Sequence, residues 1–127
     1  LKIDLNKAPD IAQTIAVTSF GLGISCNLDG LHTLKIKETD RLEALQKELS
    51  KLGATISVTD DSLNLKASSK INSNISIETY NDHRMAMAFA PLAIKTPIQI
   101  LDAGVVTKSY RNFWEDMQQI GFQFNKL

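Results

Sequence analysis

The sequence predicts a layered α/β domain in which some helices are buried on nearly every side. Short strand-like and helix-like segments alternate along the whole chain. Both halves of the chain show the order strand, helix, strand, helix, strand, and the second copy is shorter. Segments 11–20 and 83–95 are apolar around most of the helix circumference, whereas 39–52 and 108–120 are apolar on one side. This alternation favours sheets packed against buried helices.

The first helix is predicted over residues 11–20. Pro9 stops any helix that would begin before it, and Asp10 is predicted to be the N-cap. Gly21 and Gly23 are typical of the residues that end a helix. Strands are expected on either side of this helix, over residues 2–5 and 24–28.

The second helix is predicted over residues 39–52, with Thr39 as the N-cap and Gly53 just past the end. The segment Leu31–Ile36 before it is predicted to be extended. Beyond the helix, residues 55–59 and 62–66 alternate in polarity around Asp60-Asp61, which indicates a β-hairpin.

The second half is predicted to contain a strand over 75–79 and a helix over 83–95 with Asp82 as its cap. Pro91 lies inside this helix and removes one backbone hydrogen bond, so we expect a kink or an early end. The remaining predictions are a strand over 98–101, a turn over 102–104, a helix from the cap Thr107 to Ile120, and a strand over 122–124.

Composition excludes several functional classes. The chain has 127 residues, 43% of them hydrophobic, which suits one soluble domain with a real core. Its formal net charge is zero, so neither a nucleic acid nor a membrane is predicted as a partner. The single cysteine, Cys26, excludes an internal disulfide framework and fits the cytoplasm. The chain begins at Leu1, directly on a strand-like segment, so we expect it to be a piece of a longer protein.

Cations are found at three predicted helix starts, where the helix dipole disfavours them. Lys37 and Arg41 flank one start, His83 and Arg84 another, and Lys108 a third. An anionic ligand bound at these helix N-termini would explain the pattern. If the repeats bring the starts to one rim, the rim becomes an anion site that also contains the carboxylates of Asp10 and Glu38. The alternative is a set of solvated caps, in which Asp40 and Glu38 neutralise Lys37 and Arg41, and His83 and Arg84 form a surface cap next to Asp82.

Other common chemical motifs are missing from the sequence. It contains no P-loop, no dinucleotide-binding glycine motif, no metal-ligand spacing and no Ser-His-Asp pattern. The sequence therefore carries no motif for a nucleotide, a metal ion or a catalytic triad.

Two motifs carry a resemblance to a known family. The run Lys37-Glu38-Thr39-Asp40-Arg41-Leu42 and the run Tyr80-Asn81-Asp82-His83-Arg84-Met85-Ala86-Met87 resemble those of the 3-phosphoshikimate 1-carboxyvinyltransferases, or EPSP synthases. Residues 9–16 and the segment from Asp102 to Tyr110 fit the same family in order, so the resemblance covers essentially the whole chain.

The resemblance implies a fold and a place in it. The family fold consists of two inside-out α/β barrels built from βαβαββ units around buried helices. The chain resembles the C-terminal part of the second domain, as about two repeats over 1–67 and 68–127. The N-terminal domain would then be absent from this chain.

The resemblance also implies an activity and its partners. The family transfers the enolpyruvyl group of phosphoenolpyruvate to the 5-hydroxyl of shikimate 3-phosphate and releases phosphate, on the route to chorismate and aromatic amino acids. The reaction needs no cofactor, and glyphosate is the family's inhibitor. The fragment alone is expected to be inactive, because the absent domain would supply half of the site.

Residue roles follow from the matched motif positions. Asp10 matches the residue that contacts the shikimate hydroxyls and takes the proton from the attacking one. Glu38 matches the proton donor and acceptor at the phosphoenolpyruvate methylene carbon, and Lys108 is also expected to be catalytic. The other ligand contacts implied are Lys37 and Thr33 for shikimate 3-phosphate, and Arg41, Arg84, Lys108 and His83 for phosphoenolpyruvate. Many members have asparagine where this chain has Thr33.

Two other functions stay open on the sequence alone. The sister enolpyruvyl transferase, which acts on UDP-N-acetylglucosamine, shares the fold, and the choice of acceptor would distinguish it. A non-catalytic anion-binding module of the same fold is the other alternative. Asp10 and Glu38 argue against that module, because simple anion binding gains nothing from negative charge in the site.

Overall fold

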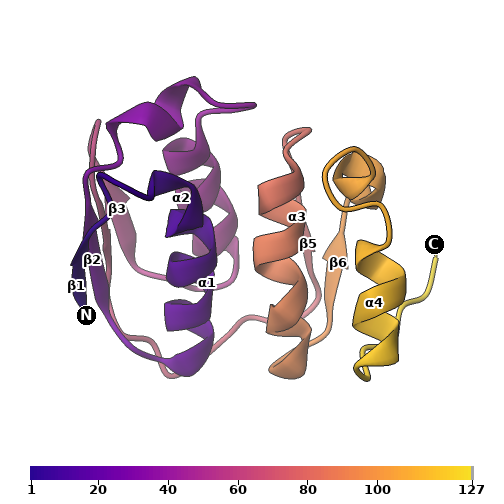
Figure 1. Ribbon diagram of the computed structural model, residues 1–127. Coiled ribbons are helices and arrows are strands. Elements are labelled where there is room, and N and C mark those ends of the chain that lie inside the picture. Colours follow the sequence, from indigo (N-terminus) through magenta and orange to yellow (C-terminus); the bar gives the residue numbers. More distant parts are fainter. Residues whose placement is uncertain (127) are drawn as a thin grey trace.

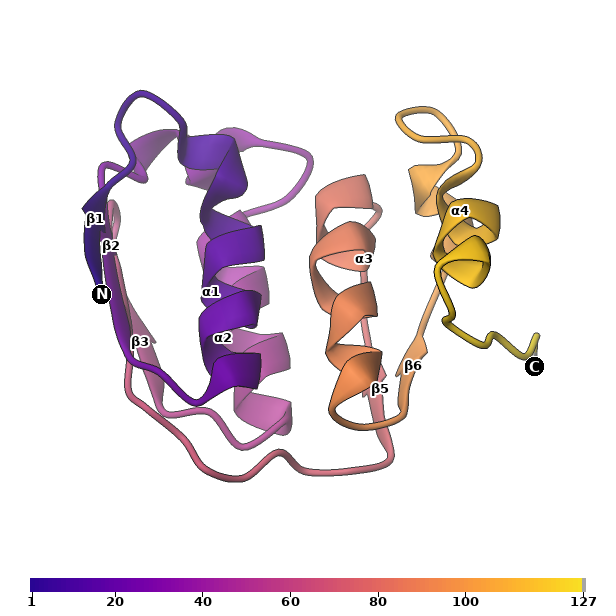
Figure 2. The ribbon, with the colours of Figure 1, turned by 60° about the horizontal axis from the view of Figure 1, so that its bottom comes forward.

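The computed structural model describes residues 1–126 as successive layers of sheet and helix. Figures 1 and 2 show a four-stranded sheet on one side, then α1 (Ala12–Leu22) with α2 (Arg41–Lys51), then α3 (His83–Phe89). A two-stranded sheet and α4 (Phe113–Gln119) follow on the far side. The predicted α/β class is confirmed. Residue 127, the last of the predicted second repeat, lies outside the described residues.

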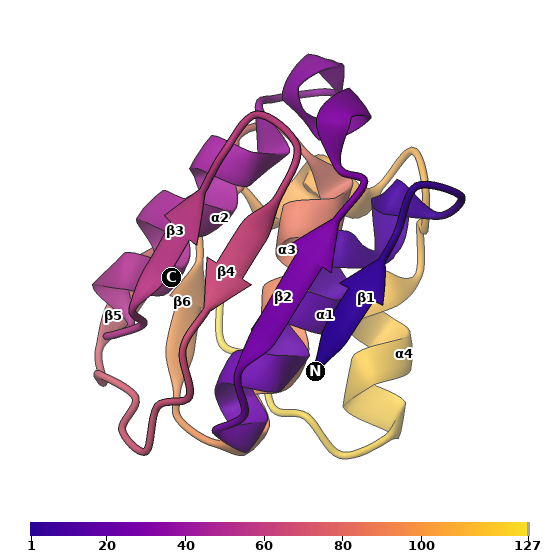
Figure 3. The ribbon, with the colours of Figure 1, turned by 90° about the vertical axis from the view of Figure 1, so that its left-hand side faces the viewer.

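The larger sheet has the strand order β1-β2-β4-β3 (Figure 3). Its strands are β1 (Lys2–Asp4), β2 (Cys26–Asp29), β3 (Ile56–Val58) and β4 (Leu63–Leu65). β1 and β2 are parallel because α1 connects them, and β4 is antiparallel to both β2 and β3. The predicted hairpin is therefore confirmed. In β2 and β4 buried and exposed residues alternate, so one face of the sheet covers the helices.

The two helices of the first half begin later than predicted. Asp10 is not an N-cap: it lies in a 3₁₀ helix, Pro9–Ile11, that leads into α1. Asp40, rather than Thr39, caps α2, because its carboxylate accepts the backbone N–H of Glu43 at 3.1 Å. The segment predicted as extended before α2 is a 3₁₀ helix, His32–Ile36. Gly53 follows α2 at a φ of 102°, as expected for the residue after a helix.

In the second half, the proline ends the regular helix early, as predicted. β5 (Ile75–Ile77) and β6 (Ile98–Ile100) are parallel and connected through α3. Asp82 caps α3 by accepting the backbone N–H of Arg84. After Phe89 the chain continues as a 3₁₀ helix, Ala90–Ile94, because Pro91 has no N–H to donate.

The predictions for the C-terminal segment are partly wrong. Thr107 follows a 3₁₀ helix, Ala103–Val106, and its hydroxyl donates to the carbonyl of Gly104, so it closes that turn and starts no helix. α4 begins only at Phe113. The predicted strand over 122–124 is not formed within the described residues, because Phe122 and Phe124 stack on each other and pack against the residues around α4.

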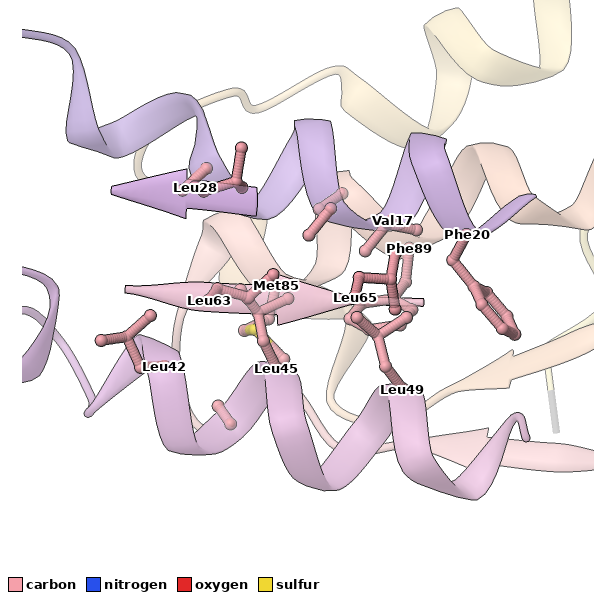
Figure 4. Packing of buried hydrophobic residues seen from close by; sticks show 14 of the residues in the cluster. Val17, Phe20, Leu28, Leu42, Leu45, Leu49, Leu63, Leu65, Met85 and Phe89 are labelled. Carbon is pink, nitrogen blue, oxygen red and sulfur yellow. The ribbon is translucent and has the colours of Figure 1, made fainter. Parts of the chain in front are cut away.

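The main core lies between the larger sheet and the three helices (Figure 4). Leu28, Leu63 and Leu65 of the sheet face Val17, Phe20, Leu42, Leu45, Leu49, Met85 and Phe89 of the helices. Within this chain α1 is not buried all round, because Thr14, Thr18 and Leu22 remain exposed along one side. No helix in residues 1–126 has the length and apolar character that crossing a membrane requires.

Candidate active site

The predicted helix starts gather at one end of the molecule. The upper end of the ribbon in Figure 1 holds the 3₁₀ turn before α1, the start of α2 and the start of α3. The turn of the 3₁₀ helix Ala103–Val106 lies toward the same end, and this helix packs against α3. The side chains of Asp10, Glu38, Arg41 and Asp82 meet at this rim, which we call the Arg41 cluster.

The Arg41 guanidinium is the centre of this cluster and is only 2% exposed. It binds Asp82 in a bidentate manner, with Nε 2.8 Å from Oδ2 and Nη2 3.2 Å from Oδ1. Nη1 donates to Asp10 Oδ1 at 3.1 Å, and Nη2 also donates to Glu38. One buried cation thus contacts three carboxylates from three segments of the chain, as a planar guanidinium with five donors can.

The position of Arg41 follows from the local structure. It is the first residue of α2, directly after the cap Asp40, and side chains on a helix lean back toward its N-terminus. The helix dipole disfavours a cation at this place. The three carboxylates offset that cost, because opposite charges interact strongly where water is excluded.

Asp82 has two roles in the structure. Its carboxylate caps α3 by accepting the Arg84 N–H at 3.0 Å, and it also holds the Arg41 guanidinium. Gln13 of α1 donates a further hydrogen bond to Oδ2 at 3.4 Å. Asp82 is fully buried, so it serves as an internal counter-ion and presents no oxygen to solvent.

The side chains of Asp10 and Glu38 reach the open side of the cluster. They are 41% and 44% exposed, in contrast to Asp82. The Lys37 ammonium lies 3.5 Å from Asp10 Oδ1, the oxygen that also accepts from Arg41. The two carboxylates that the motif positions mark as catalytic are therefore accessible and are both held by the Arg41 guanidinium.

Arg84 and His83 border the cluster. Arg84 Nη1 donates to the backbone carbonyl of Asp10 at 3.3 Å, and no carboxylate pairs with Arg84 in residues 1–126. His83 Nδ1 is 3.9 Å from Asp82 Oδ1, which is too long for a hydrogen bond. Arg84 is thus the cation of the rim that retains capacity for an anionic ligand.

Two predicted site residues stand apart. Lys108 is exposed in the turn after Val106 and makes no hydrogen bond or ion pair to the cluster within the described chain. Because no helix starts at Thr107, the expectation of a cation at a third helix N-terminus is wrong for Lys108. The Thr33 hydroxyl is buried and has no hydrogen-bond partner in the part of the chain that is described.

The cluster is balanced in charge. Lys37, Arg41 and Arg84 oppose the carboxylates of Asp10, Glu38 and Asp82. Glu38, Asp82 and His83 each bring a ligand atom within 4.8 Å of the others, a spacing that could suit a metal ion. The Arg41 guanidinium already pairs with both of those carboxylates, so the arrangement favours internal ion pairs over a metal centre.

The sequence predictions missed the counter-ion role of Asp82 and the contribution of Gln13. Asp82 was predicted only as a helix cap. The signal for its second role was Arg41 itself, because a cation at a buried helix start needs a counter-ion. Gln13 was visible as a polar residue within an apolar helical segment, a pattern that indicates a buried hydrogen bond.

Comparisons with known proteins agree with the motifs. Residues 1–117 match the family model of EPSP synthase (3-phosphoshikimate 1-carboxyvinyltransferase). A relative of that name from Bacteroides fragilis is 46% identical over 122 residues, which are 94% of this chain and 30% of that protein. One from Salmonella arizonae is 37% identical over 94% of this chain and 28% of its own length.

A solved structure gives the same answer for the fold. The EPSP synthase of Acinetobacter baumannii matches with a TM-score of 0.78 at 25% identity, over 88% of this chain and 27% of that one. The predicted resemblance and fold class are therefore confirmed. The chain spans about 30% of the length of the curated relatives it matches, and within that span it belongs to the EPSP synthase family.

Proposed function

We propose that the chain is part of an enzyme that transfers the enolpyruvyl group of phosphoenolpyruvate to the 5-hydroxyl of shikimate 3-phosphate. The observation that carries this proposal is the pair of accessible carboxylates, Asp10 and Glu38, held by one buried guanidinium. The reaction needs a base for a hydroxyl and an acid for a carbon, and two fixed carboxylates can divide these tasks. The names of the relatives support this acceptor over UDP-N-acetylglucosamine.

The steps assign one proton transfer to each carboxylate. Asp10 takes the proton of the 5-hydroxyl while the hydroxyl oxygen bonds to C2 of phosphoenolpyruvate. Glu38 in its acid form gives a proton to the methylene carbon. In the tetrahedral adduct the bond from C2 to the phosphate oxygen then breaks. The methyl carbon returns its proton to Glu38, Asp10 passes the hydroxyl proton to the departing phosphate, and the product enol ether and phosphate are released. Arg41 fixes the positions of both carboxylates through these steps.

Binding the anionic substrates requires more positive charge than the cluster supplies. The three cations and three carboxylates there balance in number, but no carboxylate pairs with Arg84 in residues 1–126, so Arg84 and the exposed Lys108 are the cations of this chain with capacity for phosphoenolpyruvate. Lys37 lies beside Asp10, where it can reach the phosphate of shikimate 3-phosphate. Further cations come from an N-terminal domain outside this chain, so the chain alone is inactive.

The proposal extends to the place of the chain in the whole enzyme. Residues 1–67 and 68–127 are two repeats in the C-terminal part of the second domain. The observed order of β1, α1, β2, α2, β3 and β4 supports the first as one βαβαββ unit. The enzyme acts in the cytoplasm and is inhibited by glyphosate, which carries anionic groups that the same cations can bind.

The first test is an assay of phosphate release with the full-length protein that contains this chain. We expect release from phosphoenolpyruvate only when shikimate 3-phosphate is present, and none from this chain alone. Release with UDP-N-acetylglucosamine instead would assign the protein to the sister activity. A folded full-length protein that releases phosphate with neither acceptor would leave the Arg41 cluster as an anion-binding site.

The second test replaces Glu38 by glutamine in the same protein. Glu38→Gln keeps the shape and removes the acid, so turnover should fall by at least about 100-fold while phosphoenolpyruvate still binds. The matched control is Glu43→Gln on α2, since Glu43 is exposed and, among residues 1–126, forms an ion pair only with Lys47. Turnover that survives Glu38→Gln would remove Glu38 from the mechanism.

A further inference from the structure

A second buried carboxylate lies on α2, outside the Arg41 cluster. Glu48 is fully buried, yet the proposed chemistry gives it no role. Its Oε2 accepts the Tyr80 hydroxyl at 2.6 Å, and its Oε1 accepts the Glu78 backbone N–H at 2.9 Å and the Lys51 ammonium at 2.6 Å. Lys51 also reaches the Ser76 carbonyl at 3.3 Å. The carboxylate thus binds α2 to the segment between β5 and α3.

Glu48 and Arg41 hold the same segment at two points. They are seven residues apart, which places them on one face of α2 two turns from each other. Glu48 holds Tyr80, and Arg41 holds Asp82, two residues further along the chain. The rigid helix therefore sets the distance between these two attachment points.

The backbone between the attachment points is strained. Tyr80 and Asn81 both adopt left-handed conformations, with φ of 54° and 56°. Such angles are uncommon for residues with side chains, and a bulky residue adopts them only when its surroundings impose them. This double left-handed step turns the chain from β5 into the cap of α3, so it decides where Asp82, His83 and Arg84 lie.

The hydrogen bond between Tyr80 and Glu48 runs from a neutral donor to a charged acceptor. Burial, and then the hydrogen bond to Glu48, raise the pKa of the Tyr80 phenol. The hydroxyl therefore stays protonated and donates a hydrogen bond to the Glu48 carboxylate. A hydrogen bond from a neutral donor to a charged acceptor is stronger than one between neutral groups.

We propose that Glu48 and Tyr80 are positioning residues for the candidate active site: their hydrogen bond keeps Tyr80 and Asn81 left-handed and so sets Asp82 against Arg41 and Arg84 at the rim. The proposal rests on the proposed function for its kinetic part. Neither residue belongs to the Arg41 cluster. Their loss should therefore weaken the binding of phosphoenolpyruvate, which Arg84 contacts, more than it slows the proton transfers at Asp10 and Glu38.

The kinetic test uses the two tyrosines of the chain. In the full-length protein, Tyr80→Phe removes only the hydroxyl and should raise the KM for phosphoenolpyruvate roughly tenfold, as expected for losing a hydrogen bond to a charged group, while kcat changes less. Tyr110→Phe is the matched control, because Tyr110 also donates to a carboxylate, that of Asp116 at 2.7 Å, but on the exposed side of α4. An unchanged KM in Tyr80→Phe, or an equal rise in Tyr110→Phe, would overturn the proposal.

A second measurement does not depend on activity. Amide hydrogen exchange over residues 78–84 should become roughly tenfold faster in Tyr80→Phe and in Glu48→Gln, while exchange in α1 stays as in the wild type. Glu43→Gln, on the exposed side of the same helix, should leave both segments unchanged. Wild-type exchange over 78–84 in the variants would overturn the positioning role even if the enzyme proves to use another acceptor. If exchange is faster in the variants but the wild-type protein shows no turnover, the positioning role is retained and the proposed function is removed.

Discussion

Single residues with buried charge determine how the rim is built. Arg41 would be costly alone in the core, because an ion that leaves water needs partners there. Asp82 meets this need most completely, with two hydrogen bonds and no exposure of its own. Asp10 and Glu38 share the same guanidinium but remain open to solvent. Asp82 is thus the internal counter-ion, and the two exposed carboxylates are the ones to which the proposed function assigns chemical roles.

Replacing the internal counter-ion should destabilise the fold. In Asp82→Asn the bidentate partner of Arg41 becomes neutral, and we expect a loss of about 3 kcal/mol in the free energy of unfolding, because Asp10 and Glu38 still neutralise part of the charge. Urea denaturation measures this loss. Asp60→Asn is the control, since Asp60 is almost fully exposed. Equal stability of the two variants would mean that Asp82 is not the principal counter-ion.

The single thiol should be unreactive in the folded chain. Cys26 is 1% exposed, and burial raises its pKa, so a smaller fraction than usual is thiolate at pH 8. A colourimetric thiol reagent should label it slowly in buffer and rapidly in denaturant. Labelling at the same rate in both would show that β2 opens readily.

At the scale of helices, the sequence patterns predicted the presence of each helix better than the residues at which it begins and ends. Thr39 and Asp40 are adjacent and both suit an N-cap, so only the structure decides between them in favour of Asp40. Asp10 has the right type and place for a cap, but Arg41 and Lys37 take its carboxylate. The pairing partner of a polar side chain depends on distant residues, and local pattern cannot supply it. Pro91 acts locally, and its effect was predictable.

The cap of α2 can be tested directly. Asp40→Ala removes the acceptor for the Glu43 N–H, and the expected loss of unfolding free energy is about 1 kcal/mol. Thr39→Ala should lower the free energy of unfolding little, because Asp40 and not Thr39 is the N-cap of α2. A larger loss from Thr39→Ala than from Asp40→Ala, measured by thermal denaturation, would restore the cap predicted from sequence.

At the scale of the whole chain, buried charges connect the two halves. Arg41 and Glu48 belong to the first half, and their partners Asp82 and Tyr80 belong to the second. Most of the element order was predictable from the alternation of patterns, although the extended segments expected over 31–36 and 122–124 are not strands. The links between halves were not predictable, because they depend on how α2 and α3 face each other.

These links predict a single unfolding transition. Trp114 lies on α4 in the second half, so its fluorescence reports that half, whereas far-ultraviolet circular dichroism reports all helices. In urea the two signals of this chain should change at the same midpoint. Separation of the halves would leave the buried Arg41 without its partner Asp82, so neither half is expected to unfold alone. Midpoints that differ by more than experimental error would show that the halves unfold separately.

The charge balance of the Arg41 cluster also governs how an anionic molecule arrives. Opposed charges cancel at distances beyond the cluster, and the chain as a whole has a formal net charge of zero. Diffusional encounter with this half of the site is therefore not accelerated by a long-range field, and added salt should change the encounter rate little. Under the proposed function, capture depends on short-range contact with Arg84, and any electrostatic guidance from farther away originates outside this chain.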